Sequence, residues 1–310
     1  MTKEKVSQRF KLLTANADMQ TFVKLKGAQK ILLSQVNAEA KSKAESSSAN
    51  HPETEAVVGH LSNSNRNVII LGAGGTGKSR VIEKFAADSR SSGKEVLICA
   101  FTGLAAMKVN GETIHSFFGF PAHSGLSLKS WSHLTPIARQ KFQIIDVLII
   151  DEISMVSADC LDAIDKKLKA ARNQPEKPFG GVRVLLLGDP YQLPPVPDKK
   201  DSLAYAEMVR KYPMGNWFFE AEAYDDGEFE QIEIVVNKRI LSDDDAKKYK
   251  LALEEIRVGV CSPETLRTIN ARVNANSLGW EQELTTIFPK KEQVNIFNKS
   301  KLDAIQGEVF

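Results

Sequence analysis

The sequence has few cysteines, no long apolar run and almost no net charge. Its three cysteines, Cys99, Cys160 and Cys261, lie far apart and form no C-x-x-C pair, which argues against a disulfide framework and against structural zinc. Apolar runs such as those at 147–150 and 184–187 are far shorter than the ~20 residues that span a bilayer. The N-terminal residues also lack the apolar stretch of a signal peptide. We therefore expect an intracellular protein, nuclear or mitochondrial in a eukaryote and cytoplasmic otherwise, with no membrane association.

The charge balance excludes a protein that attracts nucleic acid through its overall charge. The chain has 41 Lys and Arg against 39 Asp and Glu, a net charge of +2. A local basic face remains compatible with this balance. The 310 residues include 42% hydrophobic and 26% charged side chains, which is ordinary for a globular chain. At ~150 residues per domain, the length favours about two domains.

Short, continuous apolar runs predict an α/β fold with a parallel sheet. Four such runs, at 67–71, 95–101, 146–151 and 182–188, alternate with stretches that have helical spacing. Strands that are apolar throughout are typical of a parallel sheet covered by helices on both faces. We expect this sheet in a first domain at 67–225, with a small inserted hairpin at about 117–135.

The remaining segments divide into an N-terminal extension and a second unit. Apolar anchors predict a helical segment at 6–40, and the Ser- and Asn-rich residues 41–66 predict a mobile connector. We expect a second unit at 226–310, which begins with a strand at 231–236 and contains a strand at 285–288. Two strands are too few for a complete sheet, so we expect this unit to be the beginning of a domain.

A glycine-rich phosphate loop follows the first predicted strand. Residues 72–79 satisfy the pattern G-x-x-x-x-G-K-[ST] between a strand and a helix. In this pattern backbone N–H groups surround the phosphates, Lys78 reaches the β- and γ-oxygens, and the Ser79 hydroxyl ligates Mg²⁺. The residues predicted to bind nucleotide here are Gly72, Gly74, Gly75, Thr76, Gly77, Lys78 and Ser79. The cofactors predicted are therefore ATP and Mg²⁺.

Polar residues follow two other predicted strands. Asp151 and Glu152 end the run at 147–150, where a parallel sheet presents its ligand-binding edge. Asp151 suits a carboxylate that holds the Mg²⁺ shell, and Glu152 is placed to polarise the attacking water. Gln192 follows the next strand and could contact the γ-phosphate, although a proline-rich loop without a ligand is equally compatible with its sequence.

Five motifs in order resemble the petite-integration-frequency helicases, ATP-dependent DNA helicases of superfamily one. They are GAGGTGKS at 72–79, FTGLAAMKVNGETIHSFFGF at 101–120, LIIDEISMV at 148–156, KPFGG at 177–181 and LLLGDPYQLPPV at 185–196. The chain departs from the family at Gly74, where Ala is usual, and at 190–191, where Pro and Tyr replace an aromatic pair. The resemblance implies a RecA-like fold, 5′-to-3′ movement on single-stranded DNA and action at duplex junctions.

The same resemblance implies further site residues. Thr102, Thr113, His115 and Phe117 match the segment that contacts the DNA strand. A hydroxyl or imidazole can bond phosphates and a ring can stack on a base, but a core aromatic is as compatible with Phe117, and a structural histidine with His115.

Two more residues are implied from outside the five motifs. Gln29 matches an adenine-reading glutamine, with a plain helix-surface glutamine as the alternative. Arg239 matches an arginine that reaches the γ-phosphate, where it stabilises the transition state. Ile240 replaces the usual glutamine there, so Lys238 remains an alternative to Arg239.

The later motifs of a second RecA-like domain are not found before Phe310. We therefore expect a fragment that acts as a monomer, binds nucleotide and unwinds DNA weakly or not at all by itself. The alternative is a non-catalytic, nucleotide-dependent DNA-binding module derived from a helicase. DNA rather than RNA follows from the resemblance alone, because a groove that tracks phosphates accepts both sugars.

Overall fold

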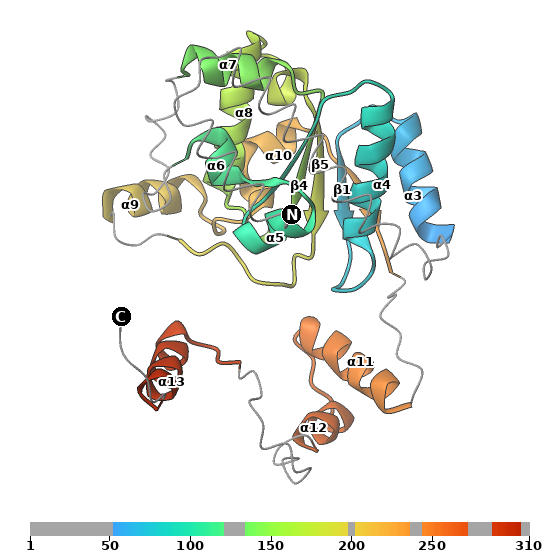
Figure 1. The fold of residues 1–310 in the computed structure, drawn as a ribbon, viewed down its shortest axis with the longest axis vertical. Helices are drawn as coiled ribbons and strands as arrows, with labels where there is room; N and C mark the ends of the chain where they lie inside the picture. The colour runs from blue at the N-terminus through green and yellow to red at the C-terminus, as the bar shows by residue number, and fades with distance from the viewer. Residues whose placement is uncertain (1–51, 121–133, 198–201, 236–243, 272–286, 305–310) are drawn as a thin grey trace. The chain divides into compact units, whose positions relative to one another are not determined.

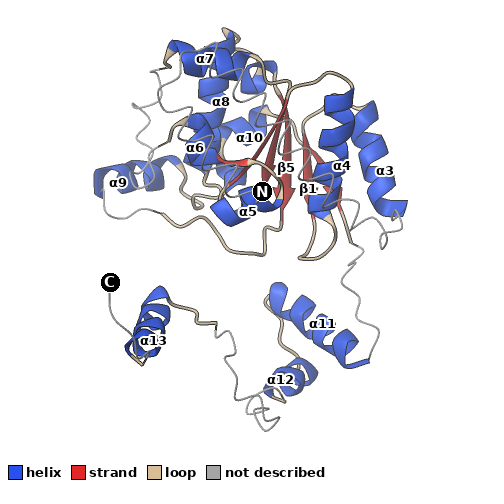
Figure 2. Cartoon of the chain, in the orientation of Figure 1, coloured by secondary structure: helices blue, strands red, loops and turns tan. Residues whose placement is uncertain are grey.

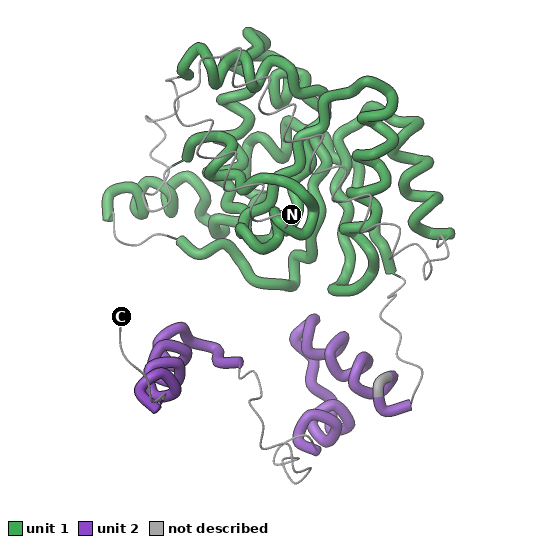
Figure 3. The backbone as a smooth tube through the Cα atoms, viewed as in Figure 1, with its two compact units in different colours: residues 1–238 green, residues 239–310 purple. Residues whose placement is uncertain are grey.

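The computed structural model describes residues 52–120, 134–197, 202–235, 244–271 and 287–304. The chain forms two compact units, residues 1–238 and residues 239–310 (Figure 3). The expected helix at 6–40 and most of the expected hairpin at 117–135 lie outside the described residues.

The described part of the first unit contains one six-stranded sheet in the order β3-β2-β4-β5-β1-β6 (Figure 2). The strands are β1 (Val68–Leu71), β2 (Val96–Ala100), β3 (Glu112–Thr113), β4 (Val147–Asp151), β5 (Arg183–Gly188) and β6 (Glu230–Glu233). Every pairing between them is parallel. The predicted α/β fold with a parallel sheet is confirmed, and four of the strands coincide with the four apolar runs.

Helices cover both faces of this sheet, as Figure 1 shows with α3 and α4 on one side and α6, α7 and α8 on the other. The helices of the first unit are α3 (Pro52–Asn63), α4 (Lys78–Ser91), α5 (Gly103–Lys108), α6 (Ile114–Phe118), α7 (Pro136–Gln143), α8 (Ala158–Arg172), α9 (Ser202–Lys211) and α10 (Glu222–Asp226). Short 3₁₀ turns occupy Ile153–Met155, Pro178–Gly181 and Phe218–Glu220.

The buried side chains form two main clusters, one on each face of the sheet. Along β4, Leu148 and Ile150 belong to one cluster, with α8. Val147 and Ile149 belong to the other, with α4. This alternation follows from the two-residue period of a strand, and it explains why the central strands are apolar along most of their length.

Part of the expected connector at 41–66 is a helix in the structure. Helix α3 buries Val57, Val58 and Leu61, which join the cluster that contains α4. The Nη1 group of Arg183 donates to the backbone oxygen of Leu61 at 2.8 Å, close to the end of the helix. The sequence prediction for residues 52–63 was wrong, because the polar residues on either side of this short apolar stripe dominated the local composition.

The strand expected to open the second unit belongs to the first sheet instead. Strand β6 pairs with β1, with Val68 opposite Glu230 and Leu71 opposite Glu233. The first unit therefore extends to Lys238, beyond the expected boundary at 225. A strand's own residues do not determine which sheet it joins, and β6 is a half-exposed edge strand without an apolar run.

The described part of the second unit consists of helices α11 (Asp244–Arg257), α12 (Pro263–Asn270) and α13 (Lys291–Asp303). Ser262 caps α12 by accepting a hydrogen bond from the backbone N–H of Thr265 at 3.2 Å, as the Ser-Pro pair predicts. Of the strand expected at 285–288, the described residues 287 and 288 lie outside any strand. No helix among the described residues of either unit is long and apolar enough to cross a membrane.

Candidate functional site

The candidate site lies at the carboxyl edge of the sheet. The phosphate loop follows β1, Gln192 follows β5, Asp151 ends β4 and Thr102 follows β2. These four strands are neighbours in the order β2-β4-β5-β1 and all run in parallel. Their carboxyl ends therefore meet at one edge, which is where open α/β sheets bind ligands.

The phosphate loop is attached to the sheet through Gly72. The backbone N–H of Gly72 donates to the oxygen of Gly188 at the end of β5, at 3.2 Å. A Cβ atom at Gly72 would lie only 2.7 Å from the backbone oxygen of Ile234, so the loop requires glycine there. Gly75 and Gly77 have φ angles of 89° and 95°, which place them in the left-handed region that favours glycine.

The side chain of Lys78 contacts the backbone of the loop that precedes it. Its Nζ atom donates to the backbone oxygens of Gly72 at 2.6 Å and Ala73 at 3.1 Å. The Thr76 hydroxyl also donates to Ala73, at 3.0 Å. Ser79 is exposed in the first turn of α4, so its hydroxyl is accessible. A cation inside the loop, an accessible hydroxyl and the start of a helix together favour the binding of a phosphate chain.

Asp151 is a buried carboxylate at the end of β4. Burial raises the pKa of Asp151, and the charge of Glu152 raises it further. The backbone N–H of Glu152, which donates to Oδ1 of Asp151 at 2.9 Å, and the charges of Lys78 and Lys108 lower this pKa in part. Lys108 lies in the last turn of α5, and sequence reasoning did not identify it because its proximity to Asp151 depends on the packing of α5.

The side chains of Ser79 and Asp151 fit Mg²⁺ by their chemistry. Both supply oxygen atoms, which this ion prefers, and proteins usually hold it through one or two carboxylates together with substrate phosphates. Asp151 is 9% exposed, so a bound cation would relieve the burial of its charge. Within the described residues, no three or more His, Cys, Asp or Glu side chains cluster as a metal site of their own.

Glu152 has a strained backbone and an unexpected partner. Its φ and ψ angles are 55° and 45°, in the left-handed region that costs an L-residue ~1–2 kcal/mol. Its Oε2 atom accepts a hydrogen bond from the Thr102 hydroxyl at 3.3 Å. Strained backbone of this kind is concentrated at functional sites. The contact joins two residues that are fifty positions apart, so no local sequence pattern could reveal it.

Gln192 lies beside the phosphate loop. Its Nε2 atom is 3.6 Å from the position that a Cβ atom on Gly74 would occupy, and it donates to Oδ2 of Asp189 at 3.3 Å. Strand β5 lies between β1 and β4, which brings Gln192 between the phosphate loop and Asp151. Asp189 orients this amide, a role that the sequence did not single out.

Two of the four residues expected to contact DNA are helix caps. The Thr102 hydroxyl accepts from the backbone N–H of Ala105, and the Thr113 hydroxyl accepts from that of Ser116, both at 3.2 Å. Each threonine is partly exposed. A capping oxygen keeps its own proton for a second partner, and at Thr102 this partner is Oε2 of Glu152, with which a nucleic-acid phosphate would have to compete.

The two ring residues of the segment differ from each other. His115 is partly buried with its ring edge-on to Phe101 and Phe120, and burial lowers its pKa, so the imidazole is neutral at pH 7. Phe117 is only 8% exposed and packs against Phe118 and Phe142. Phe117 therefore belongs to the core cluster, which favours the core-aromatic alternative, and its stacking on a base stays a prediction. Gln29 and Arg239 lie outside the described residues.

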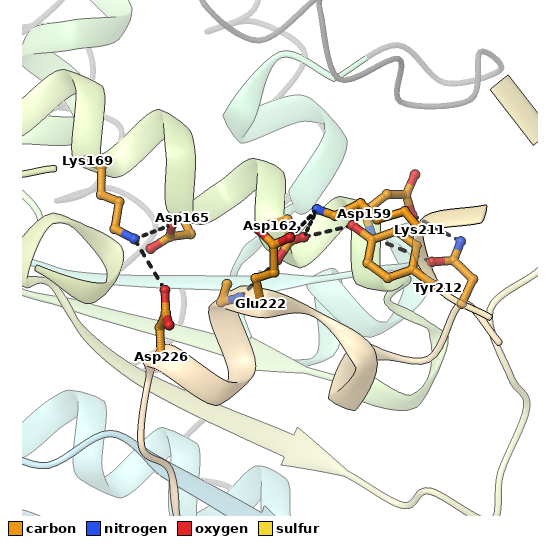
Figure 4. Close-up of polar contacts among 10 residues, drawn as sticks. Asp159, Asp162, Asp165, Lys169, Lys211, Tyr212, Glu222 and Asp226 are labelled. Carbon is orange, nitrogen blue, oxygen red and sulfur yellow. Dashed lines mark hydrogen bonds and ion pairs between the residues drawn. The ribbon is translucent and has the colours of Figure 1, made fainter. Parts of the chain in front are cut away.

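An acidic face of α8 holds the segment that follows Gln192 (Figure 4). Oδ2 of Asp162 accepts from Lys211 Nζ at 2.6 Å and from the Tyr212 hydroxyl at 2.7 Å. Oδ1 of the same residue accepts from the backbone N–H of Ala223 at 2.9 Å. Burial and the hydrogen bond from its own hydroxyl to Asp162 raise the pKa of Tyr212. A single carboxylate thus connects α8 to α9 and α10.

Comparisons with known proteins match the part of the chain that contains the candidate site. A sequence model described as PIF1-like helicase matches residues 50–212. That range contains the phosphate loop, the strand end at Asp151 and Gln192, and it contains neither Gln29 nor Arg239. ATP-dependent DNA helicase PIF5 of Trypanosoma brucei brucei is 31% identical over 227 residues, which cover 68% of this chain and 24% of that protein. ATP-dependent DNA helicase RRM3 of Saccharomyces cerevisiae is 31% identical over 270 residues, which cover 83% of this chain and 34% of that protein.

Solved structures show the same relationship. A crystal structure of Pif1 helicase from Bacteroides in complex with ADP-AlF3 and ssDNA has a TM-score of 0.70 and 27% identity, over 85% of this chain and 59% of that one. Pif1 helicase from Candida albicans has a TM-score of 0.67 and 27% identity, over 85% of this chain and 56% of that one. The chain spans about a quarter to a third of the length of the two curated relatives.

Proposed function

Because this chain belongs to the family of PIF1-like helicases, we propose that its sheet edge binds and hydrolyses ATP to drive 5′-to-3′ movement along single-stranded DNA and the unwinding of duplex DNA. The observation that carries the proposal is the convergence of Lys78, Asp151, Glu152 and Gln192 at the ends of three neighbouring parallel strands. A hydrolase needs such a convergence, because phosphate binding, metal binding and water activation must act on one phosphoryl group.

Each side chain has a distinct task in this proposal. The ammonium of Lys78 exchanges its contacts with the loop oxygens for the β- and γ-phosphate oxygens. Glu152 orients the attacking water and accepts its proton, which is a general-base role. Gln192, held by Asp189, donates to the γ-phosphate and so distinguishes the states before and after hydrolysis.

Mg²⁺ would be held by Ser79 and Asp151 together with the phosphates of ATP. When bound, this ion neutralises charge that develops on the phosphate oxygens. Asp151 is buried, so its carboxylate would be held in place to meet the ion. The backbone N–H of Glu152 holds that carboxylate by a 2.9 Å hydrogen bond.

The proposed nucleic-acid partner is single-stranded DNA at a duplex junction. The names of similar solved structures include single-stranded and forked DNA, and this supports the proposal for the present chain. Thr102, Thr113 and His115 are the candidate contacts, because each is partly exposed near the ligand-binding edge of the sheet. We propose that the chain works as a monomer.

The test is ATP hydrolysis with and without oligothymidylate, together with unwinding of a 5′-tailed duplex. We expect hydrolysis that the oligonucleotide stimulates and weak or no unwinding by this chain by itself. Lys78→Ala should lose at least ~10²-fold in hydrolysis, since the lysine contacts the transferred phosphoryl group. Full activity in Lys78→Ala would overturn the assignment of the phosphate loop. Nucleotide-dependent binding of the oligonucleotide without any hydrolysis would support the non-catalytic binding module instead.

A further inference from the structure

The Thr102 hydroxyl has one proton and two functions in the structure. Its oxygen accepts from the backbone N–H of Ala105, which caps α5, and its proton goes to Oε2 of Glu152. A hydroxyl has a single donor hydrogen, so Thr102 can serve only one acceptor at a time. Any second acceptor at this position must compete with Glu152.

The positions of Thr102 and Glu152 follow from the pairing of β2 with β4. In that pairing Ala100 lies opposite Asp151, so the chain leaves both strands at the same level of the sheet edge. Thr102 then begins α5 and Glu152 begins the 3₁₀ turn at 153–155. The two side chains therefore meet where the segment expected to contact DNA and the candidate hydrolytic centre lie next to each other.

The hydrogen bond from Thr102 to Glu152 can be replaced by another bond at little cost. Its length of 3.3 Å exceeds the usual ~2.5–3.0 Å of a hydroxyl–oxygen hydrogen bond, so breaking it costs less than breaking a short one. The backbone of Glu152 is fixed in the left-handed region and its N–H is bonded to Asp151. The side chain of Glu152 can therefore change partner while its backbone stays in place.

We propose that Thr102 is a restraint on Glu152 that the nucleic-acid backbone releases. Without bound DNA, the Thr102 hydroxyl donates to the Glu152 carboxylate. It then occupies an oxygen that would otherwise take the proton of the attacking water. A backbone phosphate at the start of α5 accepts the hydroxyl proton instead, and Glu152 becomes free to act as the base. This inference rests on the proposed function, in which Glu152 activates water and single-stranded DNA is the partner.

The experiment compares Thr102→Val, Thr102→Ser and Thr135→Val in the full chain. Thr102→Val keeps the shape of the side chain and removes the hydroxyl, whereas Thr102→Ser keeps the hydroxyl. Thr135 caps α7 by the same kind of bond, from the backbone N–H of Ala138 at 3.2 Å, so Thr135→Val controls for the loss of a cap. For each variant, kcat and KM of ATP hydrolysis are measured with and without oligothymidylate, and the thermal midpoint is recorded.

Thr102→Val is expected to raise the kcat of ATP hydrolysis in the absence of oligothymidylate by ~3–10-fold. This is the factor in rate that corresponds to one hydrogen bond. The ratio of stimulated to unstimulated kcat should fall by a similar factor while the KM for ATP stays unchanged. Thr102→Ser and Thr135→Val should keep the ratio of the original protein, although Thr135→Val should lose about as much thermal stability as Thr102→Val.

Two results would overturn the restraint. One is an unstimulated kcat in Thr102→Val that is unchanged or lower, and the other is the loss of the stimulation ratio in Thr102→Ser. If the original protein is stimulated by the oligonucleotide and Thr102→Val keeps the full ratio, only the restraint fails. If the original protein does not hydrolyse ATP at all, the proposed function fails together with the restraint.

Discussion

Glu152 combines a costly backbone conformation with a carboxylate that is only partly buried. The first four residues of β4 are buried and aliphatic and the fifth is Asp151, so the left-handed turn at Glu152 redirects the chain after Asp151 and presents the Glu152 side chain at the sheet edge. Strain of this kind persists only where the surroundings determine it. Here the bond from the Glu152 N–H to Asp151 is part of those surroundings.

A Glu152→Gln variant is therefore expected to bind ATP normally and to hydrolyse it ~10²–10⁴-fold more slowly, the usual contribution of a general base. Glutamine keeps the size of the side chain and the polar contact with Thr102. Single-turnover hydrolysis together with a fluorescent-nucleotide titration separates the two effects. Glu83→Gln, an exposed position on α4, is the matched control, and an equal loss of hydrolysis in both variants would contradict a base role for Glu152.

Alanine substitutions at two glycines of the phosphate loop are expected to have opposite effects. A Cβ atom at Gly74 would find only Gln192 Nε2, at 3.6 Å, whereas at Gly72 it would lie 2.7 Å from Ile234 O. Gly74→Ala should therefore keep nucleotide affinity within ~3-fold, while Gly72→Ala should cost ~1–3 kcal/mol of stability, as overpacking does, and weaken nucleotide binding. Thermal unfolding with and without ATP measures both. Equal behaviour of the two variants would contradict this packing of the loop against β6.

At the scale of elements, the sequence predicts the strands that are buried on both faces of the sheet. It does not predict the elements of which only one side is buried. The strands β1, β2, β4 and β5 are apolar at nearly every position, with the charged residues Arg183 and Asp151 only at strand ends, so their composition alone identified them. Helix α3 has one narrow apolar stripe between polar ends, and β6 is a half-exposed edge strand. Both elements are stabilised by partners outside their own segments, α3 by α4 and Arg183 and β6 by β1, and local patterns do not record such partners.

The packing of α3 predicts a large effect at a position that the sequence assigned to a connector. Leu61 is fully buried, so Leu61→Ala should destabilise the first unit by ~2–5 kcal/mol, the usual cost of such a truncation. Asn63→Ala, at the exposed end of the same helix, should change stability by less than ~0.5 kcal/mol. Urea unfolding of the two variants provides the comparison, and a similar small effect in both would mean that α3 does not contribute to the core.

The carboxylate of Asp162 predicts a second large effect, at the junction of α8, α9 and α10. Asp162→Ala would leave Lys211, Tyr212 and the Ala223 N–H without their common acceptor, so we expect a loss of ~3–5 kcal/mol, as when one partner of a buried ion pair is removed. Asp159→Ala, which removes only the bond from Asn216 at 3.0 Å, should cost ~1 kcal/mol. Chemical denaturation measures both free energies of unfolding. Equal losses would show that the three partners of Asp162 find other acceptors.

At the scale of the whole molecule, the sequence identified the parts of the site and not their connections. The phosphate loop, Asp151 with Glu152, and Gln192 are local motifs at strand ends, and a parallel sheet brings strand ends together. The hydrogen bond between Thr102 and Glu152 and the electrostatic effect of Lys108 on Asp151 depend instead on how α5 packs against β2 and β3. Phe117 is the opposite case. Its motif predicts a contact with DNA, whereas the structure packs its ring in the core.

The division of the molecule into two units predicts a separation of nucleotide binding from hydrolysis. Both main core clusters and the described phosphate-site residues belong to residues 1–238, so a protein of these residues should bind ATP within ~3-fold of the full chain. It lacks Arg239, the proposed transition-state arginine, and so its hydrolysis should fall by ~10³-fold. Arg239→Ala in the full chain should reproduce this loss, whereas Lys238→Ala should not, as rapid-quench hydrolysis and calorimetry of ATP binding would show. Loss of hydrolysis in Lys238→Ala alone would assign the role to Lys238, and full hydrolysis by residues 1–238 would exclude an arginine supplied by the second unit.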